Sequence, residues 1–419
     1  WDEALDASAG ALAATTPERM AVFLTSRGLT NETYYAAGKA ARALGTANID
    51  SAARVCHAPS TLGLKATIGV AASTCSLRDV IESDLVVLWG TNPANNQPVF
   101  MKYLDQAKRN GTRVVVVNPF LEPGLERYWV PSSAESAVFG TRICDLHVPV
   151  RPGGDIALAN AVLKALIARR AVDHSFIDHH TNGWAETVAA LDAQDLDDLL
   201  RQAGVDADTF ERFVDLYAGA DASVLIWSMG ITQHTFGVEG VQGIVNLGLA
   251  RGNVGRNGAG LMPIRGHSGV QGGAEMGAYA TALPGGVGID AESAAALSQQ
   301  WGFPVPDHDG LMSQAREGQD PRHRRTRTSR SDEASRTAVA VSASLTASST
   351  RPAPVWSSTT AVTEASVRAG TLPPCHTSTT SPATSPRSGA STSSTPTSPW
   401  ATSSTGSPSS PTPTAAAER

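Results

Sequence analysis

The chain has 419 residues, of which 41% are hydrophobic, and a formal net charge of −6 at neutral pH. This length allows two or more domains with their own cores, and a pI near 5.9 argues against nucleic acid as the main partner. The four cysteines form no CxxC pair, which excludes a structural zinc site or a four-cysteine iron–sulfur cluster, and no apolar run approaches the ~20 residues of a membrane helix.

Hydrophobic spacing predicts helices and strands in alternation along the first third of the chain. In order, we expect a helix over residues 1–12, a strand over 20–24, a helix over 31–44, a strand over 84–90, a helix over 97–109 and a strand over 113–117. The last three form one βαβ unit, so its strands should be parallel and its crossover right-handed.

The same pattern continues to about residue 230. We expect strands over residues 146–150 and 223–227, and helices over 155–169, 175–180, 196–203 and 207–217. The fold class is therefore α/β with Rossmann-like parallel-sheet domains. Ligands bind at the carboxyl ends of the strands in such sheets.

Near residue 310 the composition changes. Residues 321–419 consist mostly of Ser, Thr, Pro, Ala and Arg, with ten arginines against four acidic residues. Such a stretch cannot bury enough apolar surface to offset the loss of chain entropy. We therefore expect a low-complexity tail that is disordered or is an out-of-frame continuation, which is the preferred interpretation; a mucin-like stalk or a basic arm also fits its composition.

Two distant segments carry the residues best suited to chemistry. Cys56 is followed by His57, and Arg265 opens a glycine-rich segment. Cysteine is a soft metal ligand, histidine takes up a proton near neutral pH, and arginine holds a carboxylate at two points. Taken singly, each has an ordinary structural explanation: a small core thiol, a hydrogen-bonded histidine, and an arginine that anchors its own loop.

Five motifs in order resemble one family. They are residues 48–57, 84–94, 227–233, 252–255 and 265–277. Residues 1 to about 307 resemble the molybdopterin oxidoreductases of the dimethyl-sulfoxide-reductase superfamily, and within them the formate dehydrogenase alpha-subunit branch.

The resemblance implies a role for each matching residue. Cys56 corresponds to the molybdenum ligand, His57 to the histidine that handles a proton, and Arg265 to the arginine that holds the substrate carboxylate. The implied cofactor is molybdenum bis(molybdopterin guanine dinucleotide). The family also carries a 4Fe-4S cluster in a cysteine-rich segment that is absent here, so we expect a fragment of a larger enzyme.

The cofactor should lie against the loops that follow the strands. The expected binding residues are Gly90, Asn92, Pro93, Asn95, Asn118, Pro119, Gly153, Asp155, Gly230, Thr232, Gln233, Gly266 and His267. Glycine lets backbone approach a pyrophosphate closely, and helix N-termini favour its charge. Tight turns of this kind occur in any α/β sheet, so the loops indicate a cofactor site only when they are taken together.

We expect four regions: residues 1–47 as part of a discontinuous α/β domain, 48–265 as the molybdopterin-binding domain, 266–320 as the return segment of the first domain, and 321–419 as the tail. The expected function is oxidation of a small carboxylate at a cysteine-ligated molybdenum, with electrons passed to a partner. The alternatives are another oxyanion or sulfur-compound reductase of the superfamily, or a metal-free relic. The scarcity of cysteines favours the reducing cytoplasm.

Overall fold

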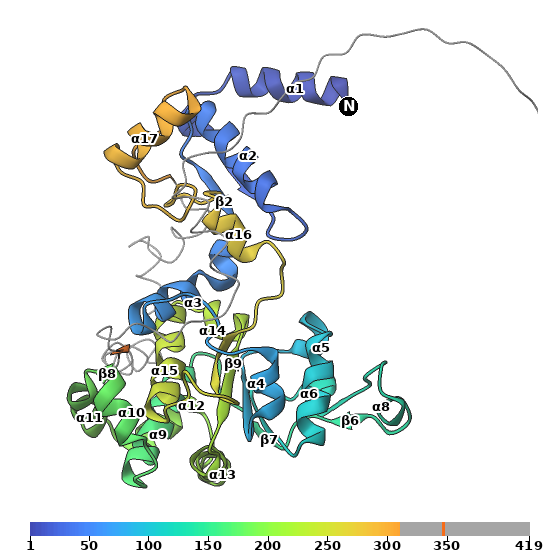
Figure 1. Cartoon of the computed structure of the whole chain (residues 1–419), viewed down its shortest axis with the longest axis vertical. Helices are drawn as coiled ribbons and strands as arrows, with labels where there is room; N and C mark the ends of the chain where they lie inside the picture. The colour runs from blue at the N-terminus through green and yellow to red at the C-terminus, as the bar shows by residue number, and fades with distance from the viewer. Residues whose placement is uncertain (311–345, 348–419) are drawn as a thin grey trace, which may run out of the picture. The chain divides into compact units, whose positions relative to one another are not determined.

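The computed structural model describes residues 1–310 and 346–347 (Figure 1). Its largest sheet has five strands in the order β10-β9-β3-β4-β7. These strands are β3 (Leu85–Trp89), β4 (Arg113–Val117), β7 (Leu146–Val148), β9 (Ser223–Trp227) and β10 (Gly260–Pro263). All neighbouring pairs are parallel, which confirms the predicted α/β class with a Rossmann-like sheet.

The strand order contains one topological switch point. From β3 the chain adds β4 and then β7 on one side, and later returns to add β9 and β10 on the other. In sheets of this order, ligands bind beyond the carboxyl ends of the strands at the point where the direction reverses. Here that point lies between β3 and β9.

Alternate residues of the strands enter two separate cores, because successive side chains of a strand point to opposite faces. Leu85, Val87 and Trp89 join one core, whereas Val86 and Leu88 join the other. A parallel sheet with helices on both faces needs such continuous apolar runs.

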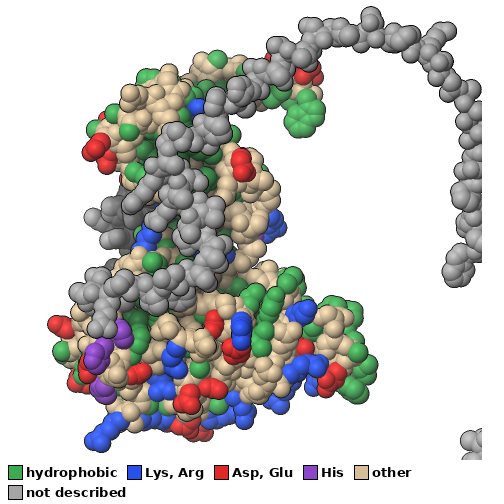
Figure 2. All heavy atoms as spheres, viewed as in Figure 1, with side chains coloured by type: hydrophobic (Ala, Val, Ile, Leu, Met, Phe, Trp, Pro, Cys, Tyr) green, Lys and Arg blue, Asp and Glu red, His purple; other side chains and the backbone are tan. Residues whose placement is uncertain are grey.

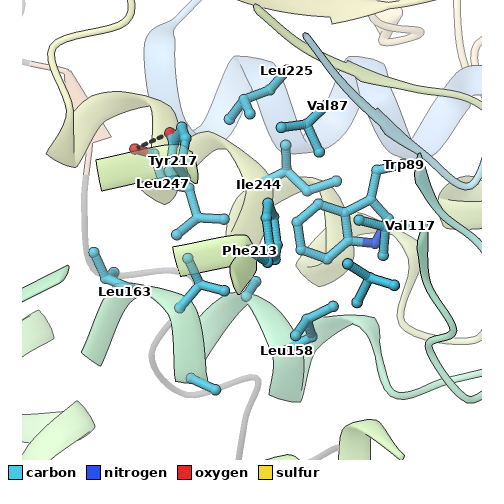
Figure 3. Close-up of a cluster of buried hydrophobic side chains, with 14 of the residues drawn as sticks. Val87, Trp89, Val117, Leu158, Leu163, Phe213, Tyr217, Leu225, Ile244 and Leu247 are labelled. Atoms are coloured by element: carbon cyan, nitrogen blue, oxygen red, sulfur yellow. Dashed lines mark hydrogen bonds between the residues drawn. The ribbon is translucent and has the colours of Figure 1, made fainter. Parts of the chain in front are cut away.

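Each face of the sheet is covered by the helices whose residues belong to the core on that face. The first core takes residues of α9 (Asp155–Ala168), α12 (Leu196–Ala203), α13 (Ala207–Gly219) and α15 (Gly237–Ala250), and the second takes residues of α4 (Leu77–Glu82) and α6 (Phe100–Arg109). Figure 3 shows part of the first core, where the rings of Trp89 and Phe213 meet edge to face with centroids 6.3 Å apart. The Tyr217 hydroxyl group donates to the Leu247 carbonyl at 2.9 Å.

A smaller core joins segments that are far apart in the sequence. Strands β1 (Val22–Leu24) and β2 (Ile49–Ser51) form a parallel pair. Tyr34 of α2 (Asn31–Ala43), Ile49 and Ala278 pack together in this core, and α16 (Val270–Glu275) packs on α2. This arrangement is compatible with a discontinuous first domain, whose predicted boundaries stay a prediction.

The remaining elements connect or flank these cores. They are α1 (Asp2–Ala13), η1 (Pro17–Arg19), α3 (Ala53–Ile68), α5 (Pro93–Asn96), α7 (Pro123–Glu126), β5 (Arg127–Tyr128), α8 (Ala134–Phe139), β6 (Thr141–Arg142), α10 (His174–His180), β8 (Thr181–Asn182), α11 (Trp184–Asp192), α14 (Met229–Thr232), α17 (Ala291–Trp301) and β11 (Thr346–Ala347). Within the described residues, no helix combines the length and apolar character needed to cross a membrane.

Most predicted elements are present with small shifts at their ends. The strands predicted over 113–117 and 223–227 have the bounds of β4 and β9. The helix predicted from residue 97 starts at Phe100, because Gln97 ends the short helix α5 and Pro98 follows it. Residues 311–320 of the predicted return segment lie outside the described residues, as does the predicted disordered tail 321–419 except for residues 346–347, which form β11 and pair with β8.

Charged side chains of both signs are mixed over the sheet-containing part of the face in view in Figure 2. Arg169, for example, pairs with both Glu211 and Asp215 at the surface. Exposed pairs of this kind contribute at most about 1 kcal/mol each to stability, since water screens them and their side chains lose freedom.

Candidate functional site

The loops after β3 and β9 touch through two glycines at the switch point. The Gly230 amide donates to the Gly90 carbonyl at 2.9 Å, and a Cβ on Gly230 would lie 2.5 Å from the Gly90 Cα. Gly90 also has a φ of +59°, in the left-handed region that favours glycine. Only glycine at both positions allows this contact.

The loops after β3 and β4 hold each other through Asn118. Its side-chain amide donates to the Thr91 carbonyl at 3.1 Å, and its own carbonyl bonds to His147 Nε2 at 2.9 Å. The Asn92 side chain caps α5 by accepting from the Asn95 amide at 3.3 Å. In the described part of the chain, the buried Thr91 Oγ1 and Gln97 Oε1 have no hydrogen-bond partner.

Cys56 lies on helix α3, which is broken directly after it. His57 has non-helical angles (φ −133°, ψ 15°) and Pro59 lies two residues further on. Proline lacks an amide hydrogen, and its ring clashes with the carbonyl four residues earlier, so it breaks the helical hydrogen bonding. The carbonyl that loses its helical donor is that of Val55.

Side chains of the segment after β9 donate hydrogen bonds to the backbone carbonyls near this break. Gln233 Nε2 donates to the Val55 carbonyl at 3.3 Å, and Thr232 Oγ1 donates to the Cys56 carbonyl at 2.5 Å. Both residues were predicted to bind cofactor. In this structure their side chains hold the cysteine segment against the switch point.

The Cys56 thiol is buried among few polar groups. Its Sγ lies 3.7 Å from Met229 Sδ, and 6% of the residue is exposed. Burial raises the pKa of Cys56, and the positive charge of Arg265 partly opposes this rise. A metal cation would favour the thiolate more strongly than one arginine, because coordination removes the thiol proton.

His57 is buried and connected to the sheet through Ser60. His57 Nδ1 and Ser60 Oγ form a hydrogen bond of 3.0 Å, and Ser60 Oγ accepts from Trp227 Nε1 at 3.0 Å. His57 Nε2 completes no hydrogen bond among the described residues, although the Ile264 backbone is near enough to favour the charged ring. Burial, reinforced by Arg265, lowers the pKa of His57 to about 3, so the ring is neutral at pH 7.

This lowered pKa predicts an acid-sensitive fold. Between pH 6.5 and 3 the unfolded chain binds a proton at His57 that the folded chain does not, so the free energy of unfolding falls as pH falls. For the metal-free chain we expect this group to cost about 3 kcal/mol between pH 7 and pH 4. Denaturant titrations of the unaltered chain and of His57→Gln at both pH values measure this cost. The contributions of other titrating groups cancel when the pH dependence of the free energy of unfolding is compared between the two proteins. Equal pH dependence in the two proteins would contradict the prediction.

Arg265 follows strand β10 and lies near both residues of the Cys-His pair. Its charge acts on the pKa of Cys56 and of His57. Its hydrogen bond to the Ala71 carbonyl is long, at 3.5 Å. The three residues predicted to be catalytic therefore lie within electrostatic reach of one another, and among the described residues the bond to Ala71 leaves other N–H groups of the Arg265 guanidinium available to a ligand.

His267 is held by the loop that follows β1. Its Nδ1 lies 3.0 Å from Ser26 Oγ, and its Nε2 lies 2.8 Å from Arg27 Nη2. A guanidinium only donates, so Nε2 is the acceptor and the proton is on Nδ1. Gly266 beside it is exposed, and its nearest neighbour is Gln97.

Other predicted residues line the ends of strands without contacting the Cys56 segment. Asp155 begins α9 after β7 and accepts from Trp89 Nε1 at 2.8 Å. Burial raises the pKa of Asp155, against the opposing effects of Trp89 and His234. Gly153 has a φ of +85° in the turn before it, and Pro119 is exposed after β4.

Sequence reasoning did not assign roles to three residues around Cys56. Met229 contacts the thiol, and Tyr279 packs against the same small cluster. Arg54, two residues before Cys56 in the sequence, contacts the Tyr279 ring. Met229 and Arg54 stand inside motifs that carried the resemblance, whereas nothing in the sequence around Tyr279 indicated its position.

The residues present fit a molybdopterin cofactor on three counts. Cys56 offers a soft sulfur ligand, and the glycine pair at the switch point leaves backbone open to close approach. Buried polar atoms without partners in the described chain, on Thr91 and Gln97, stand at the same strand ends. Buried polar groups normally have partners, so these atoms suit a polar ligand.

Comparison with known proteins agrees with the motifs. A family model described as molybdopterin oxidoreductase matches residues 1–358. The chain is 33% identical to F420-dependent formate dehydrogenase 2 subunit alpha of Methanococcus maripaludis over 286 residues, which are 68% of this chain and 40% of the relative. It is 33% identical to formate dehydrogenase H of Escherichia coli (74% of this chain, 42% of the relative) and 33% identical to Protein YdeP of the same species (74% and 42%).

These matches confirm the predicted resemblance, including its formate dehydrogenase-like branch. The chain spans about two fifths of the length of the relatives it matches, between 40% and 42% for these three.

Proposed function

Because the chain belongs to the molybdopterin oxidoreductase family, we propose that it forms the cofactor-binding part of a formate dehydrogenase-like enzyme. The observation that carries this proposal is that the segment after β9 binds both regions of the chain. Thr232 donates to the Cys56 carbonyl, and Ser228 donates to the carbonyl of Ile264, which precedes Arg265; Arg265 also acts electrostatically on Cys56 and His57. These residues come from segments about 200 positions apart in the sequence, and local packing alone does not require them to meet.

Each of the three residues has a role in this proposal. Cys56 is the protein ligand of molybdenum, which with its pterin supplies two-electron redox chemistry when bound. Arg265 orients a small carboxylate such as formate through its planar donors. His57 takes the proton released from the substrate; a thiolate at Cys56 would add negative charge beside it and so raise its low pKa.

The same proposal assigns roles to the cofactor loops, the domains and the electron path. The loops with Gly90, Asn118, Asp155 and Gly230 would hold the guanine dinucleotide arms of a bis(molybdopterin) cofactor, with Gly266 and His267 nearer the substrate. We also propose that residues 48–265 form the molybdopterin-binding domain and that residues 1–47 and 266–320 share another. Electrons would leave through a 4Fe-4S centre or a partner subunit, in the cytoplasm.

Arg265→Gln tests the substrate role. We expect formate-dependent reduction of an artificial acceptor dye to lose about 100-fold in kcat/KM, because hydrogen bonds between charged groups contribute about 1.5–3 kcal/mol. Bound molybdenum should be unchanged. Arg78→Gln is the matched control, since Arg78 is an exposed arginine of α4 whose ion pair among the described residues is with its helix neighbour Glu82. Unchanged kcat/KM in Arg265→Gln would contradict the proposal.

His267 favours a second candidate, a reductase of another oxyanion or of a sulfur compound. Here Arg27 Nη2 donates to His267 Nε2 at 2.8 Å, which brings a second positive charge towards the site. Activity with formate and an oxidising dye supports the first candidate; activity with nitrate or a sulfoxide and a reduced dye supports the second. Purified chain without molybdenum would instead support a metal-free relic.

A further inference from the structure

Tyr279 is a partly buried tyrosine without a role in the proposed function. Its ring packs against the cluster formed by Ala53, Cys56 and Val270. The charges of Cys56 and Arg265 both act on its hydroxyl group. The phenol therefore lies within electrostatic reach of the residues proposed to hold the metal and the substrate.

Arg54 fixes the ring of Tyr279. The guanidinium carbon of Arg54 lies 4.1 Å from the ring centroid, which is a cation–π contact. Arg54 Nε in turn donates to the two carboxylate oxygens of Asp50 at 3.0 and 3.3 Å, and its Nη2 lies 3.4 Å from Thr281 Oγ1. The side chains of Arg54 and Asp50 are only 16% and 3% exposed, so this support has little room to move.

Arg42 fixes the backbone on which Tyr279 stands. Its guanidinium is 1% exposed and donates to the carbonyls of Gly277, Tyr279 and Ala282 at 2.9, 3.3 and 2.9 Å. Burial lowers the pKa of Arg42 to about 10, so the group stays charged at pH 7. Charge-assisted hydrogen bonds to three carbonyls hold residues 277–282 in one conformation.

The Tyr279 hydroxyl group is an unused donor. Within the described part of the chain, Arg42 donates to the Tyr279 carbonyl and Tyr279 forms a backbone bridge with Ala282, whereas its hydroxyl group forms no hydrogen bond. Burial raises the pKa of Tyr279 to about 12, so the hydroxyl keeps its proton at neutral pH. A rigidly held donor without a protein partner is suited to a ligand.

We propose that the Tyr279 hydroxyl group donates a hydrogen bond to an oxygen of the small anion held by Arg265, and thereby selects substrates that carry an oxyanion. This inference rests on the proposed function, since it requires Arg265 to bind the substrate. Arg265 and the Tyr279 hydroxyl group act on each other electrostatically, and a carboxylate has two oxygens that can accept from both donors.

Tyr279→Phe isolates the hydroxyl group. Phenylalanine keeps the ring, its contact with Arg54 and the backbone bonds to Arg42. We expect the dissociation constant for formate, measured by titrating the purified 419-residue chain into ¹³C-formate and following its NMR linewidth, to rise about tenfold. The unfolding temperature should stay unchanged, which a merely structural role would not predict. Tyr103→Phe is the control, because Tyr103 is a half-buried tyrosine of α6, a helix that packs in the second core of the sheet and not in the cluster with Cys56.

The outcomes separate this inference from the function on which it rests. Formate affinity that falls in Arg265→Gln and in Tyr279→Phe, but not in Tyr103→Phe, supports both. Affinity that falls in Arg265→Gln alone overturns the role of Tyr279 and leaves the proposed function standing. No saturable formate binding by the unaltered chain, or equal binding by Arg265→Gln, overturns the proposed function and the inference together.

Discussion

Replacing Cys56 with alanine is expected to abolish bound molybdenum. Cys56 offers the sulfur ligand at the switch point, and its loss leaves a metal there without a bond to the protein. Thiolate ligands strongly favour soft and transition metals. Metal analysis of the purified variant measures the effect, with an expected fall from about one atom per chain to background.

Cys144→Ala is the matched control. Cys144 has the same exposed fraction as Cys56, 6%, and burial raises its pKa to about 11, but it lies in the second core of the sheet. Its removal should cost about 1 kcal/mol of stability or a little more and leave molybdenum bound. Normal molybdenum content in Cys56→Ala would remove Cys56 as a ligand.

Gly230→Ala should strongly destabilise the fold and empty the cofactor site. A Cβ at this position would lie 2.5 Å from the Gly90 Cα and 2.6 Å from the Gly90 carbonyl oxygen. Both are backbone atoms that cannot turn aside, so the two loops must separate. We expect the free energy of unfolding to fall by about 3 kcal/mol, the upper end of the usual cost of overpacking, as measured by denaturant titration.

Gly219→Ala makes the same substitution where there is space. Gly219 ends α13, is exposed, and a Cβ there would meet nothing within 4 Å. Alanine is favoured over glycine in helices by about 1 kcal/mol, so this variant should be neutral or slightly more stable. If Gly230→Ala unfolds at the same denaturant concentration as Gly219→Ala, the close contact at the switch point is disproved.

The sequence predicts the parallel sheet well because its strands are short, continuous apolar runs between turn residues. β4 and β9 have their predicted bounds. Helices α3 and α15 were not predicted, for physical reasons. α3 contains Pro59 and a break at His57, and α15 is buried on all sides, so neither shows the one-sided apolar spacing of a surface helix.

The sequence pointed to candidate site residues but not to the contacts that support them. The resemblance pointed to Cys56, His57 and Arg265, and the structure brings them together. It could not indicate that Thr232 and Gln233 would bind the backbone of residues 55 and 56. Nor could it indicate that Arg42 would place Tyr279 beside them, because these contacts join segments more than 170 residues apart.

The broken helix at Cys56 also has a consequence for the order of folding. The Cys56 carbonyl receives its side-chain donor from a residue 176 positions later, so synthesis must pass β9 before the cysteine segment can reach its final form. Closing so long a loop is entropically costly and slow unless the intervening structure is already in place. The β3–β4–β7 half of the sheet can form first, and the backbone around Cys56 is then completed only when β9 docks beside β3.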